Sequence, residues 1–312
     1  MSDSCTLSIV VPVYNEQESI LPLYGKIRTA CEPIGKPCEV IFVDDGSRDN
    51  TFAILEEIHK QDAQLKVIRF RKNYGQTAAM AAGFQYAHGD VIVSMDGDLQ
   101  NNPADIPPLV AKLDDGFDVV CGWRKNRQDK FLSRRLPSIV ANWIIGRVTG
   151  VRIHDNGCSL KAYRANVIKR VALYSELHRF IPAMSTLTGA RIAEIVVNHH
   201  ARRFGRSKYG ISRIWRVALD IITVKMIISF ASRPGIWFAL PSVACFLLGL
   251  FTLFFVVGAY DDVEGRFGAS AVAFLLLFLS GHLFATSIIG ELSMKTGDYR
   301  PGKTLEPTVS AL

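Results

Sequence analysis

The stretch Val91-Ile-Val-Ser-Met-Asp96-Gly-Asp98-Leu-Gln100 decides how the rest of the 312-residue chain is interpreted. It begins as an apolar run of strand length and ends in two carboxylates separated by one glycine. Hard oxygen ligands of this kind suit Mg²⁺ or Mn²⁺, which usually bridges substrate phosphates through one or two carboxylates. The pattern therefore predicts a metal site formed by Asp96, Asp98 and the side-chain oxygen of Gln100.

Similar apolar runs occur on either side of this stretch, and amphipathic segments separate them. The predicted strands are residues 7–11, 40–43, 66–70, 91–95 and 118–121. The predicted helices between them are residues 19–31, 49–59, 76–87 and 105–113. Such alternation indicates βαβ units, and hence an α/β fold with a mainly parallel sheet.

Ligands of such sheets bind beyond the carboxyl ends of the strands, so the residues that follow each strand are candidates for a binding site. A carboxylate and an aromatic ring there can hold a nucleobase and a ribose. An aspartate-rich turn that caps the next helix is the alternative for residues 44–49, and both interpretations can hold together. The candidates for nucleotide binding at these strand ends are Pro12, Tyr14, Glu16, Asp44, Asp45, Gln76 and Asp96, and for Pro12, Tyr14, Glu16 and Asp44 the contact is what the family resemblance given below implies.

A dense basic stretch follows the fifth predicted strand, and Asp129 is its only acid. Arginine suits bidentate contacts with phosphate, although any single cation could instead face solvent or lipid headgroups. The basic residues are Arg124, Lys125, Arg127, Lys130, Arg134 and Arg135. As a set they predict an anionic partner. Asp155, in a glycine-containing loop at residues 154–158, could orient that partner, orient an arginine or cap a turn.

The segments around that loop mix helix-like and strand-like patterns. A helix is predicted over residues 132–148, further helix after residue 158 and a strand over residues 191–197. Six cysteines show neither a CxxC pair nor metal-ligand spacing, which indicates reduced thiols in a cytosolic domain. The first residues lack the features of a signal peptide.

Two long apolar segments close the sequence. Residues 235–260 carry no charged side chain and residues 268–290 carry only His282, so each is long enough to cross a membrane. Residues 212–233 have apolar residues at helical spacing, which predicts a helix at the membrane interface or an ordinary packed helix. Basic flanks place the domain at residues 1–211 and the tail at 291–312 in the cytosol, with a short linker at 261–267 outside.

Several stretches together resemble the family 2 glycosyltransferases, which have the GT-A fold. Within that family the chain is similar to polyprenyl-phosphate glycosyltransferases, such as dolichyl-phosphate mannose synthase and, most of all, undecaprenyl-phosphate 4-deoxy-4-formamido-L-arabinose transferase. One departure is the glycine between Asp96 and Asp98, where the arabinose transferase has alanine. Besides the strand-end motifs, the matching stretches are 73–76, 98–103, 127–129, 155–158, 161–164, 180–182 and 204–209.

The resemblance implies an inverting transfer of a sugar from a nucleotide diphosphate, with UDP favoured, to a polyprenyl phosphate at the cytosolic membrane face. It implies Mg²⁺ or Mn²⁺ as cofactor and a homo-oligomer, a tetramer in relatives. Asp98, Asp155 and Arg124 would be catalytic. The implied acceptor-phosphate residues are Arg124, Arg127, Arg134 and Ser138, and the implied phosphate-loop residues are Arg203, Arg206 and Lys208.

Other functions remain as alternatives. A non-catalytic membrane adaptor for nucleotide or anionic lipid would leave the carboxylate pair unexplained, and a GDP-mannose-dependent mannose synthase belongs to the same class. A processive polysaccharide synthase would need more spans to enclose a channel. The net charge of +7 is compatible with nucleic acid, but the basic residues crowd toward the apolar segments, which disfavours it.

Overall fold

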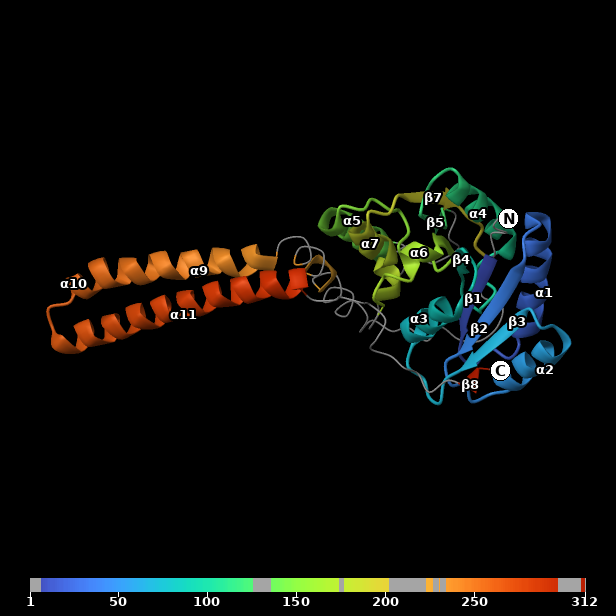
Figure 1. The fold of residues 1–312 in the computed structure, drawn as a ribbon, viewed down its shortest axis with the longest axis horizontal. Coiled ribbons are helices and arrows are strands. Elements are labelled where there is room, and N and C mark those ends of the chain that lie inside the picture. The colour runs from blue at the N-terminus through green and yellow to red at the C-terminus, as the bar shows by residue number, and fades with distance from the viewer. Residues whose placement is uncertain are drawn as a thin grey trace. The chain divides into compact units, whose positions relative to one another are not determined.

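The computed structural model describes residues 7–125, 136–173, 177–201, 223–226, 230, 234–296 and 310–311. These residues belong to two compact units. The first, within residues 1–224 and 300–312, is an α/β domain. The second, within residues 225–299, is a pair of long apolar helices (Figure 1).

A mixed sheet forms the centre of the α/β domain, and its described part has the strand order β7-β5-β6-β4-β1-β2-β3-β8. β1 pairs in parallel with β2 and β4, and β2 with β3. β6 is antiparallel to both β4 and β5, β7 is parallel to β5, and β8 is antiparallel to β3. The strands are Leu7–Val13, Cys38–Asp44, Leu65–Arg69, Val91–Ser94, Val119–Trp123, Lys161–Arg164, Ile192–Val196 and Ser310–Ala311, for β1 to β8.

Because β6 is antiparallel to both β4 and β5, these two strands run in the same direction. The carboxyl ends of β1, β2, β3, β4, β5 and β7 therefore lie along one edge of the sheet, which we call the carboxyl edge. The opposite edge, where these strands begin, is the amino edge. This arrangement confirms the predicted α/β fold with a mainly parallel sheet, and it gathers the loops after those strands on one side.

Helices cover both faces of the sheet. On one face lie α1 (Ile20–Cys31), α2 (Thr51–Gln61) and α4 (Ile106–Asp114), and on the other lie α3 (Gln76–Tyr86), α6 (Ala165–Ile168) and α7 (Ile181–Ser185). The remaining helices of the described domain are α5 (Leu136–Thr149) and the short 3₁₀ turns η1 (Glu32–Ile34), η2 (Pro103–Asp105), η4 (Leu177–Phe180) and η5 (Thr186–Thr188).

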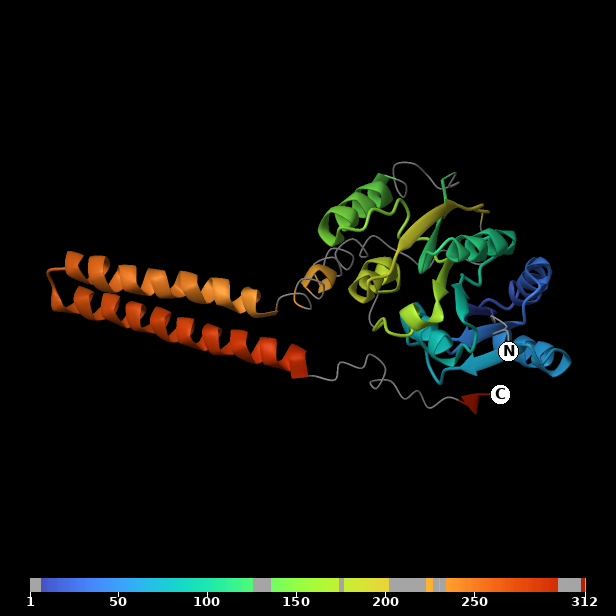
Figure 2. The same ribbon diagram turned by 45° about the horizontal axis from the view of Figure 1, so that its top comes forward.

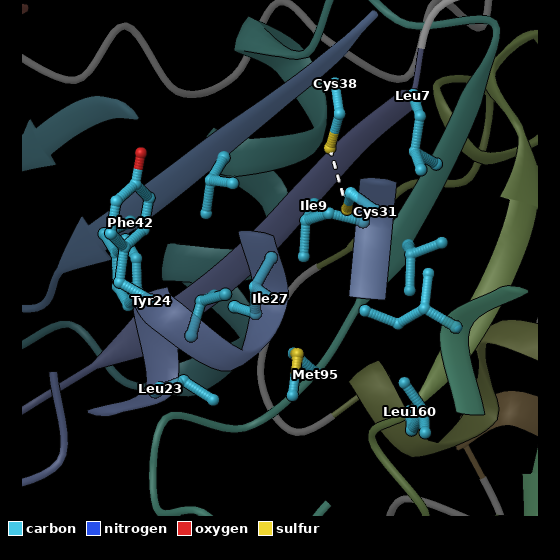
Figure 3. Packing of buried hydrophobic residues seen from close by; sticks show 14 of the residues in the cluster. Leu7, Ile9, Leu23, Tyr24, Ile27, Cys31, Cys38, Phe42, Met95 and Leu160 are labelled. Carbon is cyan, nitrogen blue, oxygen red and sulfur yellow. Dashed lines mark hydrogen bonds between the residues drawn. The ribbon is translucent and has the colours of Figure 1, made fainter. Parts of the chain in front are cut away.

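The two cores follow from the alternation of side chains along the strands. Leu7 and Ile9 of β1 pack with Ile27 of α1 on one face, as Figure 3 shows, whereas Val10 packs against α3 on the other. α3 comes so close that a Cβ on Gly83 would lie 2.2 Å from a methyl group of Val10. A larger residue at position 83 would push the helix away from the sheet.

The described cysteines all carry free thiols. Two of them meet in the first core, where the thiol of Cys38 donates to the sulfur of Cys31 over 3.0 Å (Figure 3).

The sequence prediction was wrong after Cys158. We expected further helix there, but residues 161–164 form β6 before α6 begins. Ala162 and Tyr163 are the only apolar residues of this strand, and Lys161 is as buried as they are. A strand so short, with charged residues at both ends, lacks the apolar run that marks the other strands.

The second unit is a helical hairpin whose bounds differ from the predicted spans. The first arm comprises α9 (Pro234–Phe251), a π-helical stretch η6 (Thr252–Val256) and α10 (Val257–Ala259). The second arm, α11 (Val263–Thr296), begins inside the segment that we expected to be the linker, because Asp262 accepts a hydrogen bond from the backbone N–H of Gly265 and so caps the helix.

Both arms are long and apolar enough to cross a membrane, over Gly235–Ala259 and Val263–Ser293. Only 17% of the most apolar 18-residue stretch of each arm is buried, so most apolar side chains of that stretch face outward. The two arms pack antiparallel, as Figure 2 also shows, and Ser242 of α9 donates a hydrogen bond to the carbonyl of Ser280 in α11. An apolar exterior with its polar groups turned inward is what a bilayer requires.

Candidate active site

The loop after β1 is tied to the loop after β2 at the carboxyl edge. The backbone N–H of Asn15 donates to Ser47 Oγ, and that of Glu16 donates to Thr51 Oγ1, each over 2.9 Å. Asn15 has a φ of 53°, a left-handed conformation that is uncommon for a residue with a side chain. The predicted residues Pro12, Tyr14 and Glu16 therefore lie on a segment that the neighbouring loop fixes, and all three are half-buried.

Asp44, the last residue of β2, is fully buried. Its Oδ1 accepts the backbone N–H of Ser47 over 2.9 Å. Its Oδ2 has no hydrogen-bond partner in the described part of the chain, and the closest cation is Arg69, whose Nε lies 3.8 Å away. A buried carboxylate oxygen without a hydrogen bond is costly, and a donor from a bound base would satisfy it.

The neighbouring Asp45 holds the next loop rather than facing an open site. Its two oxygens accept the backbone N–H groups of Tyr74 and Gly75, over 2.7 and 2.9 Å. Burial raises the pKa of Asp45 in spite of these bonds, and the charge of Asp44 adds to the effect. The loop then leads into α3, whose first residue is Gln76.

Asp96 and Asp98 follow β4 and form the acidic centre of the carboxyl edge. Gln76 Nε2 donates to Asp96 Oδ1 over 2.7 Å, and the backbone N–H of Gln100 donates to Asp98 Oδ1 over 3.1 Å. Burial and the charge of Asp98 raise the pKa of Asp96, against the opposing effects of Ser159, Arg124 and Lys161. The structure thus brings together the predicted residues Gln76, Asp96 and Asp98.

The backbone between the two carboxylates and the next helix is strained. Leu99 has a φ of 63°, so this loop and the one after β1 each place a non-glycine residue in the left-handed region. Such conformations cost roughly 1–3 kcal/mol each and tend to occur at functional sites. They set the direction in which the preceding side chains leave their strands.

The carboxylates fit a divalent cation by their chemistry. Asp96 is half-buried and Asp98 is buried, and burial together with the charge of Asp98 raises the pKa of Asp96, so a cation bound beside them would stabilise both ionised carboxylates. Within the described ranges no group of three His, Cys, Asp or Glu side chains could enclose a metal. Substrate phosphates would therefore have to supply further ligands, which is the usual way in which Mg²⁺ binds.

Arg124 and Asp155 form a buried ion pair beside this centre. The guanidinium donates from Nε and from a terminal nitrogen to the two carboxylate oxygens, over 2.7 and 2.9 Å. The side chains are only 10% and 5% exposed. Burial lowers the pKa of Arg124, but the hydrogen bonds with Asp155 outweigh this and raise it. Of the three roles expected for Asp155, the structure matches the orientation of an arginine.

Residues 8–172 match the protein-family model of glycosyl transferase family 2. The chain belongs to that family. The stretch covers β1 to α6 and thus includes every strand-end residue described above, so the expectation drawn from those motifs is confirmed. This family 2 glycosyltransferase also has close relatives over almost its full length.

The dodecaprenyl-phosphate galacturonate synthase of Rhizobium johnstonii is 42% identical over 303 residues, which cover 94% of this chain and 89% of that one. The undecaprenyl-phosphate 4-deoxy-4-formamido-L-arabinose transferase of Salmonella paratyphi B is 38% identical over 288 residues, covering 91% and 87%. The resemblance to polyprenyl-phosphate glycosyltransferases is therefore confirmed. The sequence motifs favoured the arabinose transferase, but the galacturonate synthase shares more identity with this glycosyltransferase.

Among solved structures, the glucosyl-3-phosphoglycerate synthase of Mycobacterium tuberculosis, in complex with Mn²⁺ and UDP-glucose, has a TM-score of 0.54 at 17% identity. The match covers 71% of this glycosyltransferase and 78% of that chain. At this identity the likeness concerns the fold alone, and it confirms the GT-A-like architecture.

Some predicted site residues cannot be placed. Arg127, Arg134, Arg203, Arg206 and Lys208 lie outside the described residues, as does most of the predicted interface helix. Ser138 belongs to α5 by its backbone.

Sequence reasoning did not assign a role to Ser159 or Lys161. Asn101 Nδ2 donates to Ser159 Oγ over 2.7 Å, and the buried Lys161 donates to the carbonyls of Asn156 and Cys158. Both side chains contribute to the electrostatic environment of Asp96. Neither residue carried a sequence signal of this role, because the burial of Lys161 beside Ala162 and Tyr163 becomes visible only in the structure.

Proposed function

We propose that this glycosyltransferase moves a sugar from a nucleotide diphosphate sugar, UDP-linked rather than GDP-linked, to a polyprenyl phosphate. The carboxylate pair Asp96–Asp98 at the carboxyl edge, next to the buried Arg124–Asp155 pair, carries the chemical part of the proposal. The names of both relatives, which specify dodecaprenyl and undecaprenyl phosphate, support the acceptor.

Mg²⁺ or Mn²⁺ is the proposed cofactor, and Asp96, Asp98 and Gln100 are its proposed ligands. A divalent cation bound there would neutralise charge on the departing nucleotide diphosphate. The raised pKa of Asp96 supports this assignment, because burial and the charge of Asp98 disfavour its ionised form, and a cation bound there would offset both effects. The fold neighbour that was solved with Mn²⁺ and UDP-glucose is in keeping with it.

The chain's own residues would each perform a distinct task. The unsatisfied Oδ2 of Asp44 would accept a hydrogen bond from the base, next to Pro12, Tyr14 and Glu16. Gln76 orients Asp96, and Asp45 supports it by holding the loop before it.

A lipid phosphate is already ionised at neutral pH, so it needs cationic donors rather than a strong base. Arg124 would bind it and hold one oxygen in line with the anomeric carbon. The bond from that oxygen to the anomeric carbon forms as the bond to the nucleotide diphosphate breaks, so the configuration inverts. The remaining cations of the predicted basic segments would assist on the acceptor and donor phosphates.

The helical hairpin supports a membrane location. We expect the helices over Gly235–Ala259 and Val263–Ser293 to cross the bilayer, with the catalytic domain and both termini in the cytosol. A homo-oligomer is also expected. Anchoring would keep the site where the polyprenyl chain resides, and so raise the local concentration of the acceptor.

A panel of radiolabelled nucleotide sugars tests the proposal with the purified full chain, with and without undecaprenyl phosphate. The panel contains UDP-galacturonate, UDP-4-deoxy-4-formamido-L-arabinose, UDP-glucose and GDP-mannose. We expect a lipid-linked sugar only when one UDP-sugar and the lipid are both present. Nucleotide binding without turnover of any donor would support the adaptor instead, and transfer from GDP-mannose alone would favour the mannose synthase.

A further inference from the structure

The turn at residues 154–158 carries Asp155, and three neighbouring elements hold it besides Arg124. Asn142 of α5 donates from Nδ2 to the carbonyl of His154 over 2.7 Å. Lys161 of β6 donates to the carbonyls of Asn156 and Cys158. These contacts satisfy carbonyl groups of the turn. The backbone N–H groups of His154 and Asp155 need a different partner.

Glu194 of β7 provides that partner. Its Oε1 accepts the backbone N–H of His154 over 2.8 Å and that of Asp155 over 3.2 Å. Its Oε2 lies 2.8 Å from the ring Nδ1 of His154. The carboxylate is only 13% exposed, whereas the side chain of His154 is 65% exposed, so the acceptor of these bonds is shielded from water and the imidazole is not.

The ring of His154 is fixed from a second side. It stacks on the indole of Trp123, with ring centroids 4.2 Å apart and an angle of 17° between the planes. Trp123 ends β5 and is followed directly by Arg124. Glu194 is therefore linked to both residues of the ion pair. It binds the backbone N–H of Asp155 directly, and it binds the ring of His154, which stacks on Trp123, the residue before Arg124.

From these contacts we infer that Glu194 is a positioning residue for sugar transfer, which fixes the turn so that Asp155 aims Arg124 at the acceptor phosphate. The inference rests on the proposed function. Glu194 touches neither Arg124 nor a reacting atom in this arrangement, and it acts through the backbone of His154 and Asp155.

The amino edge offers a matched control. Glu39, the second residue of β2, binds His88 in the same way: its Oε1 accepts the backbone N–H over 2.7 Å and its Oε2 lies 3.4 Å from Nδ1. His88 lies between α3 and β4, far along the strands from the carboxyl edge. Removal of Glu39 breaks its bonds to the backbone and ring of His88 and the bond that Ser8 Oγ donates to it over 2.6 Å. Removal of Glu194 breaks its bonds to the backbone and ring of His154 and to the backbone of Asp155, so only Glu194 holds a turn of the active site.

The test compares Glu194→Ala, Glu194→Gln and Glu39→Ala in the full chain. We expect Glu194→Ala to lower kcat about 30-fold and to raise KM for undecaprenyl phosphate, with KM for the nucleotide sugar unchanged. Glu194→Gln should recover at least a third of the turnover, because an amide oxygen still accepts both backbone N–H groups. Glu39→Ala should keep kcat within twofold of the wild-type value.

Hydrogen exchange provides a readout that does not depend on activity. The peptide that contains residues 154–158 should exchange at least tenfold faster in Glu194→Ala and at the wild-type rate in Glu39→Ala. Unchanged exchange of this peptide, or a kcat within twofold of wild type in folded Glu194→Ala, would overturn the inference. Equal loss of kcat in both alanine variants would also overturn it. If the wild-type chain transfers no sugar, the proposed function fails, and the exchange experiment still decides whether Glu194 fixes the turn.

Discussion

The two edges of the sheet use the same interactions for different ends. At the amino edge, Glu39 binds the backbone and ring of His88, and this contact simply closes the connection between α3 and β4. At the carboxyl edge, Glu194 makes the same contact with His154, but the next residue is Asp155, which pairs with a buried arginine. The same local chemistry thus becomes functional through what lies next to it in the chain.

The edges also differ in what burial does to charge. Ion pairs at the amino edge, such as that between Lys112 and Asp115, leave their side chains 36% and 61% exposed. The carboxyl edge buries Asp44, Asp98 and the Arg124–Asp155 pair, and it contains both described non-glycine residues with positive φ. Burying charge and straining backbone destabilise a fold, so their concentration at one edge indicates a site shaped by ligands rather than by stability.

The largest difference between the edges should appear when an aspartate is removed from either end of β4. Asp98→Ala should lower kcat about 1,000-fold, because the developing charge on the leaving diphosphate loses its support. Asp90→Ala, at the exposed start of the same strand, should leave kcat within twofold. Transfer of labelled sugar to undecaprenyl phosphate measures both, and membrane fractions should hold equal amounts of each variant. Normal turnover by Asp98→Ala would refute the metal assignment.

The sequence alone predicted much of this edge, because apolar runs that end in polar residues are a local feature. The strands before Asp44 and Asp96 were identified in this way, and the parallel topology then placed their ends together. Gln76 was predicted to bind nucleotide. Its hydrogen bond to Asp96 was not predicted, because that contact depends on how α3 packs beside the end of β4.

Other features depend on contacts between distant residues and left no local trace. β6 has no apolar run, and its place between β4 and β5 follows from tertiary pairing. Glu194 lies on a strand that was predicted, but its partners are 39 and 40 residues earlier in the chain. Asp45 shows the same limit, since its bonds to the loop before Gln76 give it a structural task that a strand-end motif does not reveal.

Two glycines with similar backbone conformations, one at each edge of the sheet, allow a second comparison of the two edges. Gly46, at the carboxyl edge, has a φ of 70°, and Gly35, before β2 at the amino edge, has a φ of 65°. A Cβ on Gly46 would lie 2.6 Å from the backbone carbon of Lys72, whereas one on Gly35 would meet nothing within 4 Å.

Alanine at either glycine should cost about 1 kcal/mol for the left-handed conformation. We expect Gly46→Ala to lower the free energy of unfolding by about 3 kcal/mol in total, because the loop before Gln76 must also move. KM for the nucleotide sugar should rise in this variant and stay constant in Gly35→Ala. Urea unfolding of the solubilised chain gives the stabilities, and equal losses in the two variants would show that the close contact is not rigid.

The smallest expected effect concerns two histidines and pH. His178 is buried in the domain and shares a hydrogen bond of 2.7 Å with Thr77, the residue after Gln76, whereas the side chain of His88 is 82% exposed. Burial lowers the pKa of His178 to about 3, and Arg179 and Lys161 add to the shift. The unfolded chain, with an ordinary pKa of 6.5, therefore binds more protons than the folded chain between these two values.

Stability must then fall as the pH drops from 6.5 toward 3, and this histidine should contribute about 2 kcal/mol of the loss at pH 5. His178→Gln keeps a polar partner for Thr77 and removes the titrating ring. The loss of unfolding free energy between pH 7 and pH 5 should be about 2 kcal/mol smaller in this variant than in the wild type, with His88→Gln measured as the exposed control. If His178→Gln and the wild type lose the same stability over that range, the ring of His178 is not held neutral in the folded chain. The hydrogen bond between His178 and Thr77 in the first turn of α3 would then not depend on a neutral ring.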